Sequence, residues 1–251
     1  MKMFDFANIL FAGPCNRFCP WCIGKRLPAR VSPSNLDLWP PRNLDGFVEM
    51  VNRERVPEVV FTGTVTDPHL YRYEGRLIEE LRRRLHPRAR ISVHTNGALS
   101  LKKLSVFNLY DRAAISFPSF EPGIYEKLMG SRRVPDLAGI LERAAIPVKV
   151  SAVVNEHNEG GIEKFLARCR RIGVRRLVLR RLFGDHTPWP SWEGLRPAGE
   201  YRGNPVMDFS GMEVTLWSFE AATCRSLNLF ADGTLGTSYL LTETPELRRL
   251  S

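Results

Sequence analysis

The chain has 251 residues, of which 43% are hydrophobic, and its 36 lysines and arginines exceed its 27 acidic residues, giving a net charge of +9. This composition predicts a folded globular protein and excludes an intrinsically disordered one. No apolar run approaches the roughly 20 residues that a membrane span needs. Asp5 and Asn8 interrupt the N-terminal apolar stretch that a secretory signal would require. We therefore expect a cytoplasmic protein with no membrane association.

The cysteines are unevenly distributed. The chain has five, an odd number, and three of them lie within eight residues, between Cys15 and Cys22. A secreted disulfide scaffold would carry more cysteines at regular spacing. The pattern instead favours a metal site.

The positive charge is concentrated between Arg168 and Arg181, a stretch with seven arginines and no acidic residue. Such a block is typical of a surface that binds nucleic acid or an anionic small molecule, and equally of a solvated helix face. Aromatic residues that would stack on bases are absent from it. A nucleic-acid partner is therefore not supported, although it remains one alternative.

In chain order, short apolar runs alternate with amphipathic helical patterns. Six strands are predicted, over residues 7–11, 58–61, 91–94, 113–117, 147–154 and 177–179. Four helices are predicted between them, over residues 47–51, 77–85, 134–144 and 162–172, with Gly173 as the cap of the last. This alternation predicts an α/β fold with a parallel sheet covered by helices. Its active site is expected at the C-terminal ends of the strands.

After residue 183 the alternation of strands and helices ends. Residues 184–205 contain prolines, glycines, Trp189 and Trp192, and are expected to form a long irregular loop that contacts the substrate. A strand is then predicted over residues 214–218, and a hairpin over residues 227–230 and 235–241. We therefore expect a C-terminal extension over residues 183–251.

The most specific motif is Cys15-Asn-Arg-Phe-Cys19-Pro-Trp-Cys22, which lies directly after the first predicted strand. Three thiolates at this spacing suit an iron–sulfur cluster whose fourth iron is left open. The alternative is a zinc site, which needs a fourth ligand. None follows nearby, since the next cysteine is Cys169 and the nearest histidine is His69.

With this motif the sequence resembles the radical S-adenosylmethionine (SAM) superfamily. Trp21 precedes the third cysteine, where that family prefers an aromatic residue, and residues 61–68 follow the second strand, where it carries a glycine-rich segment. The resemblance implies a [4Fe–4S] cluster on Cys15, Cys19 and Cys22. It also implies a partial (β/α)6 barrel over residues 1–182, with the short β-hairpin extension beyond it.

The resemblance further implies a set of SAM-binding residues. The methionyl amino group would be held by Thr62, Gly63 and Thr64, with Asp67 as the acidic member of the segment. Thr95 and Asn96 match the threonine-asparagine-glycine found after the third strand, and Ser116 and Asn155 close the fourth and fifth strands. Because neighbouring residues of a strand face opposite ways, only one of Arg180 and Arg181 can face the barrel interior. We expect Arg180 to do so and to pair with the SAM carboxylate.

The stretch from Cys224 to Leu235 resembles the hairpin of SPASM and Twitch extensions, without the further cysteines that would bind an auxiliary cluster. Cys224 is therefore a candidate catalytic thiol that returns a hydrogen atom to a substrate radical. The alternative for Cys224 is a small buried side chain. Cys169 lies on an apolar helix face and is expected in the core.

The resemblance implies an enzyme that reductively cleaves SAM to a 5′-deoxyadenosyl radical, which takes a hydrogen atom from a small molecule. Epimerisation of a sugar or nucleotide-sugar intermediate in natural-product biosynthesis, with Cys224 as hydrogen donor, is the favoured outcome. The alternatives are radical cyclisation or rearrangement of a nucleotide-like or peptide substrate, and a metal-bearing nucleic-acid-binding protein. The expected partners are the substrate and an external electron donor such as flavodoxin or ferredoxin.

Overall fold

The computed structural model describes residues 4–237. Six strands form a parallel sheet in chain order, and each lies within two residues of its predicted position. These strands are β1 (Phe6–Phe11), β2 (Glu58–Gly63), β3 (Arg90–Thr95), β4 (Arg112–Ser116), β5 (Val148–Val153) and β6 (Arg176–Arg180). Each connection between them carries helices, as a parallel sheet requires.

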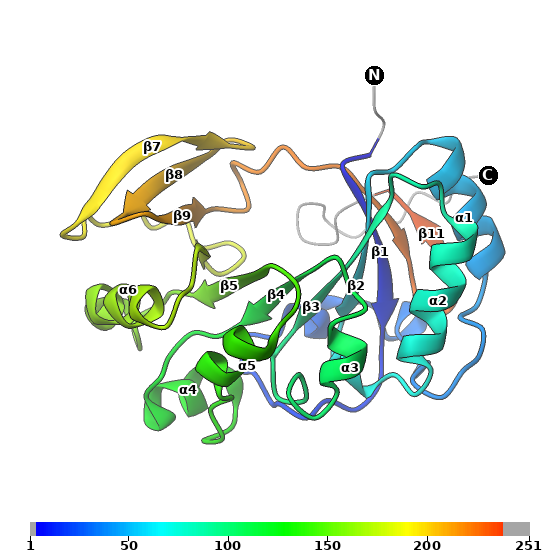
Figure 1. Cartoon of the computed structure of the whole chain (residues 1–251), viewed down its shortest axis with the longest axis horizontal. Helices are drawn as coiled ribbons and strands as arrows, with labels where there is room; N and C mark the ends of the chain where they lie inside the picture. Colours follow the sequence, from blue (N-terminus) through cyan, green and yellow to red (C-terminus); the bar gives the residue numbers. More distant parts are fainter. Residues whose placement is uncertain (1–3, 238–251) are drawn as a thin grey trace.

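The helices lie along the outer side of the curved sheet (Figure 1). They are α1 (Leu44–Arg53), α2 (Glu74–Arg84), α3 (Leu104–Phe107), α4 (Pro122–Met129), α5 (Leu137–Arg143) and α6 (Ile162–Arg171). Four short 3-10 helices accompany them, η1 (Ile23–Arg26), η2 (Ala29–Val31), η3 (Pro68–Leu70) and η4 (Glu159–Gly161). Within residues 4–237, no helix is both long enough and apolar enough to cross a bilayer.

Helix α6 shows why the predicted helices form where they do. Ile162, Phe165, Leu166 and Cys169 fall on one face and are buried, while the arginines of the last turn face outward near the negative end of the helix dipole. Gly173 follows with φ +92°, which only glycine adopts without strain. Cys169 is thus a core residue, as predicted.

Helices α3 and α4 were not predicted, because both are short. Helix α4 begins with Pro122 in its first turn and ends at Gly130, whose φ is +65°. Only Tyr125, Leu128 and Met129 of its eight residues are buried, which leaves too brief a periodic pattern to detect.

The sheet continues beyond β6 through an antiparallel unit of β7 (Leu195–Tyr201), β8 (Asn204–Phe209) and β9 (Met212–Trp217), of which β9 pairs in parallel with β6. The expected irregular loop over residues 184–205 is therefore wrong from Leu195 onward. Strand β7 is exposed along nearly its whole length, so no hydrophobic alternation marks it. Its turn to β8 uses Arg202 and Gly203, with φ of 54° and 81°.

The other edge of the sheet is extended by β10 (Ser226–Leu229), which pairs in parallel with β1, and β11 (Leu235–Gly236), which pairs antiparallel with β10. This is the predicted hairpin, except that residues 238–241 lie outside the described residues. The strand order is β11-β10-β1-β2-β3-β4-β5-β6-β9-β8-β7. Strands on both sides of residue 182 thus share one sheet, and the proposed division at residue 182 stays a prediction.

The segment between β9 and β10 crosses from one side of the curved sheet to the other (Figure 1). Asp5, just before β1, secures it at Arg225, because the Asp5 backbone nitrogen donates to the Arg225 carbonyl at 2.9 Å and the Asp5 carboxylate accepts from the Arg225 backbone nitrogen at 2.9 Å. The curved sheet encloses a cavity of about 460 Å³, lined by inward-facing residues of β1 to β6, β9 and β10. Small-molecule sites commonly have this size.

Candidate functional site

The three cysteines of the motif lie in the loop that joins β1 to η1, at the C-terminal end of the parallel strands. The loop is held on two neighbouring elements. The Cys22 thiol donates to the carbonyl oxygen of Thr64 at 3.3 Å, just after β2. The backbone nitrogen of Phe18 donates to the carbonyl oxygen of Met129 at 3.2 Å, at the end of α4.

Two glycines permit this close packing of the loop. A Cβ atom on Gly24 would lie 1.7 Å from the carbonyl oxygen of Thr64, and one on Gly130 would lie 2.4 Å from that of Phe18. Both contacts are with backbone, which cannot move aside as a flexible side chain could. The position of the cysteine loop therefore depends on glycine at both points.

The three thiols share a partly buried environment. Burial raises the pKa of Cys15, and burial together with the neighbouring Cys22 and Cys15 thiols raises that of Cys19 to about 11. Three thiolates at this place would repel one another unless a cation compensated them. Because thiolates are the ligand form, cluster binding here would release protons.

The residues around the loop fit an iron–sulfur cluster with bound SAM. The buried side-chain nitrogens of Asn16, beside Cys15, and Asn155, after β5, have no hydrogen-bond partner, and such donors are satisfied by a bound group. Within residues 4–237, no three histidine, cysteine or acidic side chains converge closely enough to hold a single metal ion. A cubane cluster does not require that convergence, because each thiolate binds a different iron.

The segment after β2 forms part of the cavity wall through Thr62, Gly63 and Thr64. The Thr64 hydroxyl donates to the carbonyl of Phe11 at 3.0 Å, so it joins the ends of β1 and β2 rather than facing a ligand. A Cβ on Gly63 would lie 1.8 Å from the carbonyl of Thr66. Glycine is thus required by the turn of this segment itself.

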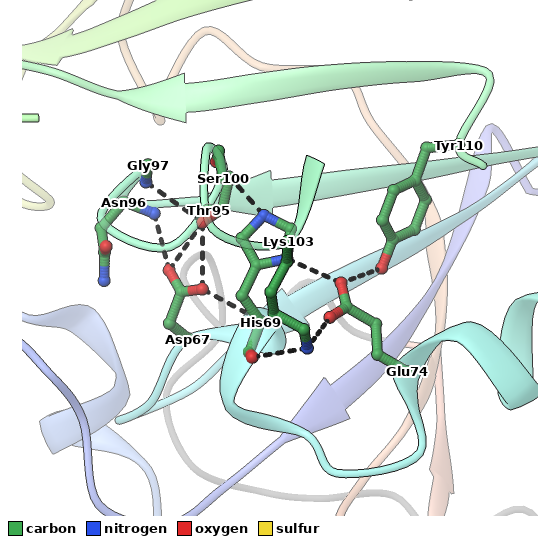
Figure 2. Close-up of polar contacts among 9 residues, drawn as sticks. All are labelled: Asp67, His69, Glu74, Thr95, Asn96, Gly97, Ser100, Lys103 and Tyr110. Carbon is green, nitrogen blue, oxygen red and sulfur yellow. Dashed lines mark hydrogen bonds and ion pairs between the residues drawn. The ribbon is translucent and has the colours of Figure 1, made fainter. Parts of the chain in front are cut away.

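Asp67 organises the ends of β2 and β3 (Figure 2). Its carboxylate accepts hydrogen bonds from the Thr95 hydroxyl at 3.0 and 2.9 Å, from the backbone nitrogen of Asn96 at 2.6 Å and from that of His69 at 3.0 Å. The Asn96 amide in turn donates to Asn16 at 2.7 Å, beside Cys15. Thr95 and Asn96, expected to contact SAM, therefore have these side-chain groups engaged within the protein.

Sequence reasoning missed a second group of buried polar side chains, which adjoins Asp67 through His69. His69 Nδ1 donates to Glu74 at 2.7 Å, and the Glu74 carboxylate also accepts from Tyr110 at 2.8 Å and from Lys103 (Figure 2). Ser100 lies 3.3 Å from His69 Nε2. Ser100, His69 and Glu74 follow the order of a hydrolase triad. However, they are only 0%, 2% and 1% exposed, so no substrate reaches them.

The buried side chains around Glu74 also fix its charge. Burial alone would raise the pKa of Glu74, but the hydrogen bonds and charges of His69 and Lys103 outweigh burial and lower it. Glu74 is therefore an anion in this site, and the ion pair ties η3 to α2 and to the turn before α3. A glutamate five residues after a histidine gave no recognisable motif.

The other predicted site residues occupy different places. Arg180 faces the cavity, as predicted, and its Nε donates to Ser151 at 2.8 Å. Arg181 faces the opposite side of the sheet, where it pairs with Glu159 at 2.9 Å and its guanidinium lies 4.4 Å from the ring centre of Trp189. Trp189 and Trp192 are therefore packing residues on that outer side and do not line the cavity.

Ser116 and Cys224 lie at opposite ends of the barrel. Ser116 is the exposed last residue of β4, at the same end as the cysteine loop. Cys224 lines the cavity but precedes β10, level with Asp5, at the N-terminal end of the strands. Burial raises the pKa of its thiol, which keeps it protonated. The structure thus brings Cys224 into the cavity but not toward the three cysteines.

The comparisons with known proteins agree with this geometry. No family model matches the chain. Over 90 residues the chain is 33% identical to a probable GTP 3′,8-cyclase from Methanococcus aeolicus, and the match covers 34% of this chain and 30% of the cyclase. The comparison therefore reaches less than a third of that protein's length.

Solved structures of radical SAM enzymes show the same fold. SuiB of Streptococcus suis, bound to its precursor peptide SuiA, has a TM-score of 0.56 at 15% identity, over 72% of this chain and 40% of SuiB. The enzyme anSMEcpe with bound AdoMet has a TM-score of 0.51 at 18% identity, over 71% and 52% of the two chains. TYW1 with a lysine-pyruvate adduct has a TM-score of 0.50 at 15% identity, over 75% of this chain and 70% of TYW1.

These likenesses lie below 25% identity and show that the chain shares the fold of these radical SAM enzymes. The shared fold includes the parallel strand order β1 to β6, with the cysteine loop directly after β1. The structure of anSMEcpe contains bound AdoMet.

Proposed function

We propose that this chain uses SAM and a [4Fe–4S] cluster to take a hydrogen atom from a small molecule bound in the barrel cavity. The observation that carries this proposal is the position of the cysteine loop. Its Cys22 is anchored on Thr64, which lines the cavity together with Thr62 and Gly63. A group held by the three thiols would therefore lie at the mouth of the cavity.

Cys15, Cys19 and Cys22 would hold the cluster, which would supply the one-electron reduction of SAM to methionine and a 5′-deoxyadenosyl radical, with the electron coming from an external donor such as flavodoxin or ferredoxin. The chain's own residues position and shield this chemistry. Asp67 and Asn96 hold the strand ends against Asn16 and the cysteine loop. The curved sheet surrounds the substrate and limits the access of water.

The residues expected to bind SAM, apart from Arg180, divide into two groups. Thr62 and Gly63 contribute hydroxyl and carbonyl groups to the methionyl ammonium, while Ser116 and the unpartnered amide of Asn155 meet the ribose. Thr64, Thr95 and Asn96 act as positioning residues, because their side chains are engaged by Phe11, Asp67 and Asn16. Mutation of the second group is expected to lower cluster occupancy as well as SAM affinity.

Electron paramagnetic resonance on anaerobically reconstituted protein tests the proposal. A chain with about four irons should show a reduced cluster signal that changes when SAM is added, since SAM occupies the open iron. A reduced signal that is identical with and without SAM would count against SAM as cofactor. Bound zinc in place of iron would favour a metal-bearing binding protein.

Epimerisation is the finer proposal, and two observations favour it. Cys224 lines the cavity and remains a protonated thiol, the form that can give up a hydrogen atom. After the 5′-deoxyadenosyl radical takes a hydrogen atom from one face of the substrate, the Cys224 S–H would return one from the other face. The resulting thiyl radical is restored by one electron from the external donor and one proton.

This outcome requires that one substrate carbon lie within reach of both the 5′-deoxyadenosyl radical and the Cys224 thiol, which lies at the end of the strands away from the three cysteines. Sugar phosphates and nucleotides can first be screened by the 5′-deoxyadenosine that they induce. In deuterium oxide, an epimerised product should carry one deuterium at the inverted carbon, and Cys224→Ala should abolish its incorporation. A new intramolecular bond in the product would instead identify the cyclisation or rearrangement alternative.

A further inference from the structure

The wall of the cavity is more basic than acidic, but most of its charges are paired. Three of the arginines form ion pairs with acidic residues, Arg112 with Glu58, Arg176 with Glu213 and Arg202 with Asp5. These pairs include the only acidic residues among the residues that line the cavity within the described part of the chain. Any further cation on the wall therefore has no acid left to neutralise it.

Three cations that line the cavity form no ion pair with any residue between 4 and 237: Arg90, Lys149 and Arg180. Arg90 is the exposed first residue of β3, whereas Lys149 and Arg180 are half-buried. The Nε of Arg180 donates to Ser151 at 2.8 Å, and its guanidinium lies 5.4 Å from the ring centre of Trp217. These contacts fix the guanidinium on the wall and leave its terminal nitrogens for a ligand.

Sheet register places Lys149 in the same row as Thr62 of the proposed SAM site. The paired residues Thr62, His94, Ala114 and Lys149 form one continuous row across β2, β3, β4 and β5, and all of them line the cavity. His94 is open to the cavity, and desolvation by the surrounding barrel, with the positive charges of Lys149, Arg180 and Arg112, lowers its pKa. His94 is therefore a neutral hydrogen-bonding group beside the two cations.

We propose that Lys149 and Arg180 bind a phosphate group of the substrate inside the cavity. The proposal deepens the proposed function, on which it rests for the assignment of the cavity to the substrate. Two uncompensated positive charges match a phosphate monoester, which carries between about −1.5 and −2 charges at neutral pH. The planar guanidinium can accept two phosphate oxygens, and the ammonium of Lys149 adds a point charge.

The charge state of Lys149 gives the site a measurable signature. Burial, with the positive charges of Arg180, Arg176 and Arg112, lowers the pKa of Lys149 to about 8, and Glu58 opposes this only in part. A bound phosphate would reverse that effect and raise the pKa. Above pH 8, phosphate binding should therefore take up protons from the buffer.

Isothermal titration calorimetry on the full chain tests the site, both before and after cluster reconstitution. The probes are inorganic phosphate, ribose 5-phosphate, acetate and SAM. We expect both phosphates to bind far more tightly than acetate, with proton uptake at pH 8.5 detected as a difference between buffers of unlike ionisation enthalpy. Lys149→Met and Arg180→Gln should each weaken phosphate binding about 10- to 100-fold.

Two controls keep the result interpretable. Arg171→Gln removes one charge from the exposed face of α6 and should leave phosphate binding unchanged. Arg180→Lys keeps the positive charge but loses the paired N–H donors of the guanidinium. It should therefore retain part of the phosphate affinity that Arg180→Gln loses. Circular dichroism spectra would identify a variant that failed to fold.

The outcomes separate this proposal from the proposed function. Phosphate binding that is equal in the wild type and both cavity variants, or absent in all of them, would overturn the phosphate site even if the reconstituted chain cleaves SAM. Displacement of every anion by SAM would overturn it too, because Arg180 would then hold the SAM carboxylate. Variant-sensitive phosphate binding in a chain that incorporates no iron would support the site while the proposed function fails.

Discussion

The Oδ2 atom of Asp67 lies 2.6 Å from the backbone nitrogen of Asn96, which joins the segment after β2 to the segment after β3. The same carboxylate accepts from the Thr95 hydroxyl, while the Asn96 side chain contacts Asn16 in the cysteine loop. One buried acid thus connects three of the strand ends that surround the proposed cofactor. Its role is to position other residues, because its hydrogen bonds are all made within the protein.

Asp67→Asn should therefore weaken both the fold and the cluster site. The amide retains one oxygen but places an NH₂ group against backbone N–H donors, at an expected cost of about 1–3 kcal/mol in the free energy of unfolding. Urea denaturation of the cluster-free protein measures this cost, and iron content after reconstitution should also fall. Asp45→Asn, at an exposed ion pair with Arg84, serves as the control. Equal behaviour of the two variants would contradict the positioning role.

Glu74 is predicted to make stability depend on pH. Because its pKa in the folded protein lies below its ordinary value of 4.5, it contributes stability above about pH 4.5 that is lost as pH falls through the folded pKa. The free energy of unfolding should thus fall more steeply between about pH 5 and 3 in the wild type than in Glu74→Gln. At pH 7, Glu74→Gln should cost about 3–5 kcal/mol, because it breaks a buried ion pair.

Glu80→Gln provides the matched control for this prediction. Glu80 pairs with Arg83 at 2.6 Å on the exposed side of the same helix, so its loss should cost less than about 1 kcal/mol and leave the acid slope unchanged. If the acid slope of Glu74→Gln equals that of the wild type, Glu74 is not the group that causes it.

The strands of the barrel could be predicted because their apolar runs are short, buried and separated by clear helical patterns. Strand β7 could not, because its residues are exposed and its order depends on pairing with β8. The place of Cys224 was also beyond sequence reasoning. It follows from the parallel pairing of β10 with β1, which joins Phe6 to Ser226 across 220 residues.

The site was predictable to the extent that it follows a linear motif. Cys15, Cys19 and Cys22 are close in sequence, so their spacing alone indicated a shared ligand. The cluster of His69, Glu74, Lys103 and Tyr110 combines the turn after β2, α2 and both ends of α3, and only tertiary packing brings them together. The sequence marks Asp67 as the acid of the motif, but it does not indicate that Thr95 and Asn96 bind Asp67, so both are expected to contact the cofactor.

Gly63→Ala should disrupt the segment after β2. The added Cβ would lie 1.8 Å from the backbone oxygen of Thr66, so the segment must shift, at an expected cost of about 1–3 kcal/mol. Equilibrium dialysis of the reconstituted protein should show weaker SAM binding. Gly123→Ala is a control in helix α4, where a Cβ meets nothing within 4 Å and is expected to stabilise the protein by about 0.4–1 kcal/mol.

The cysteines should separate cleanly by function. Cys15→Ala, Cys19→Ala and Cys22→Ala should each prevent stable incorporation of iron, because the cluster loses one of its three protein ligands. Cys169→Ala should retain iron and cost about 1 kcal/mol of stability, since Cys169 is buried in the core on α6. Iron and sulfide assays measure the first effect. Retention of a full cluster in any of the three loop variants would exclude that cysteine as a ligand.

The most direct test of the account is the formation of 5′-deoxyadenosine from SAM by the anaerobically reconstituted and reduced chain, compared with Cys22→Ala prepared in the same way. The account predicts 5′-deoxyadenosine and methionine in equal amounts from the wild type and none above background from the variant. A wild-type chain that holds about four irons yet forms no 5′-deoxyadenosine with dithionite or with reduced flavodoxin would contradict it.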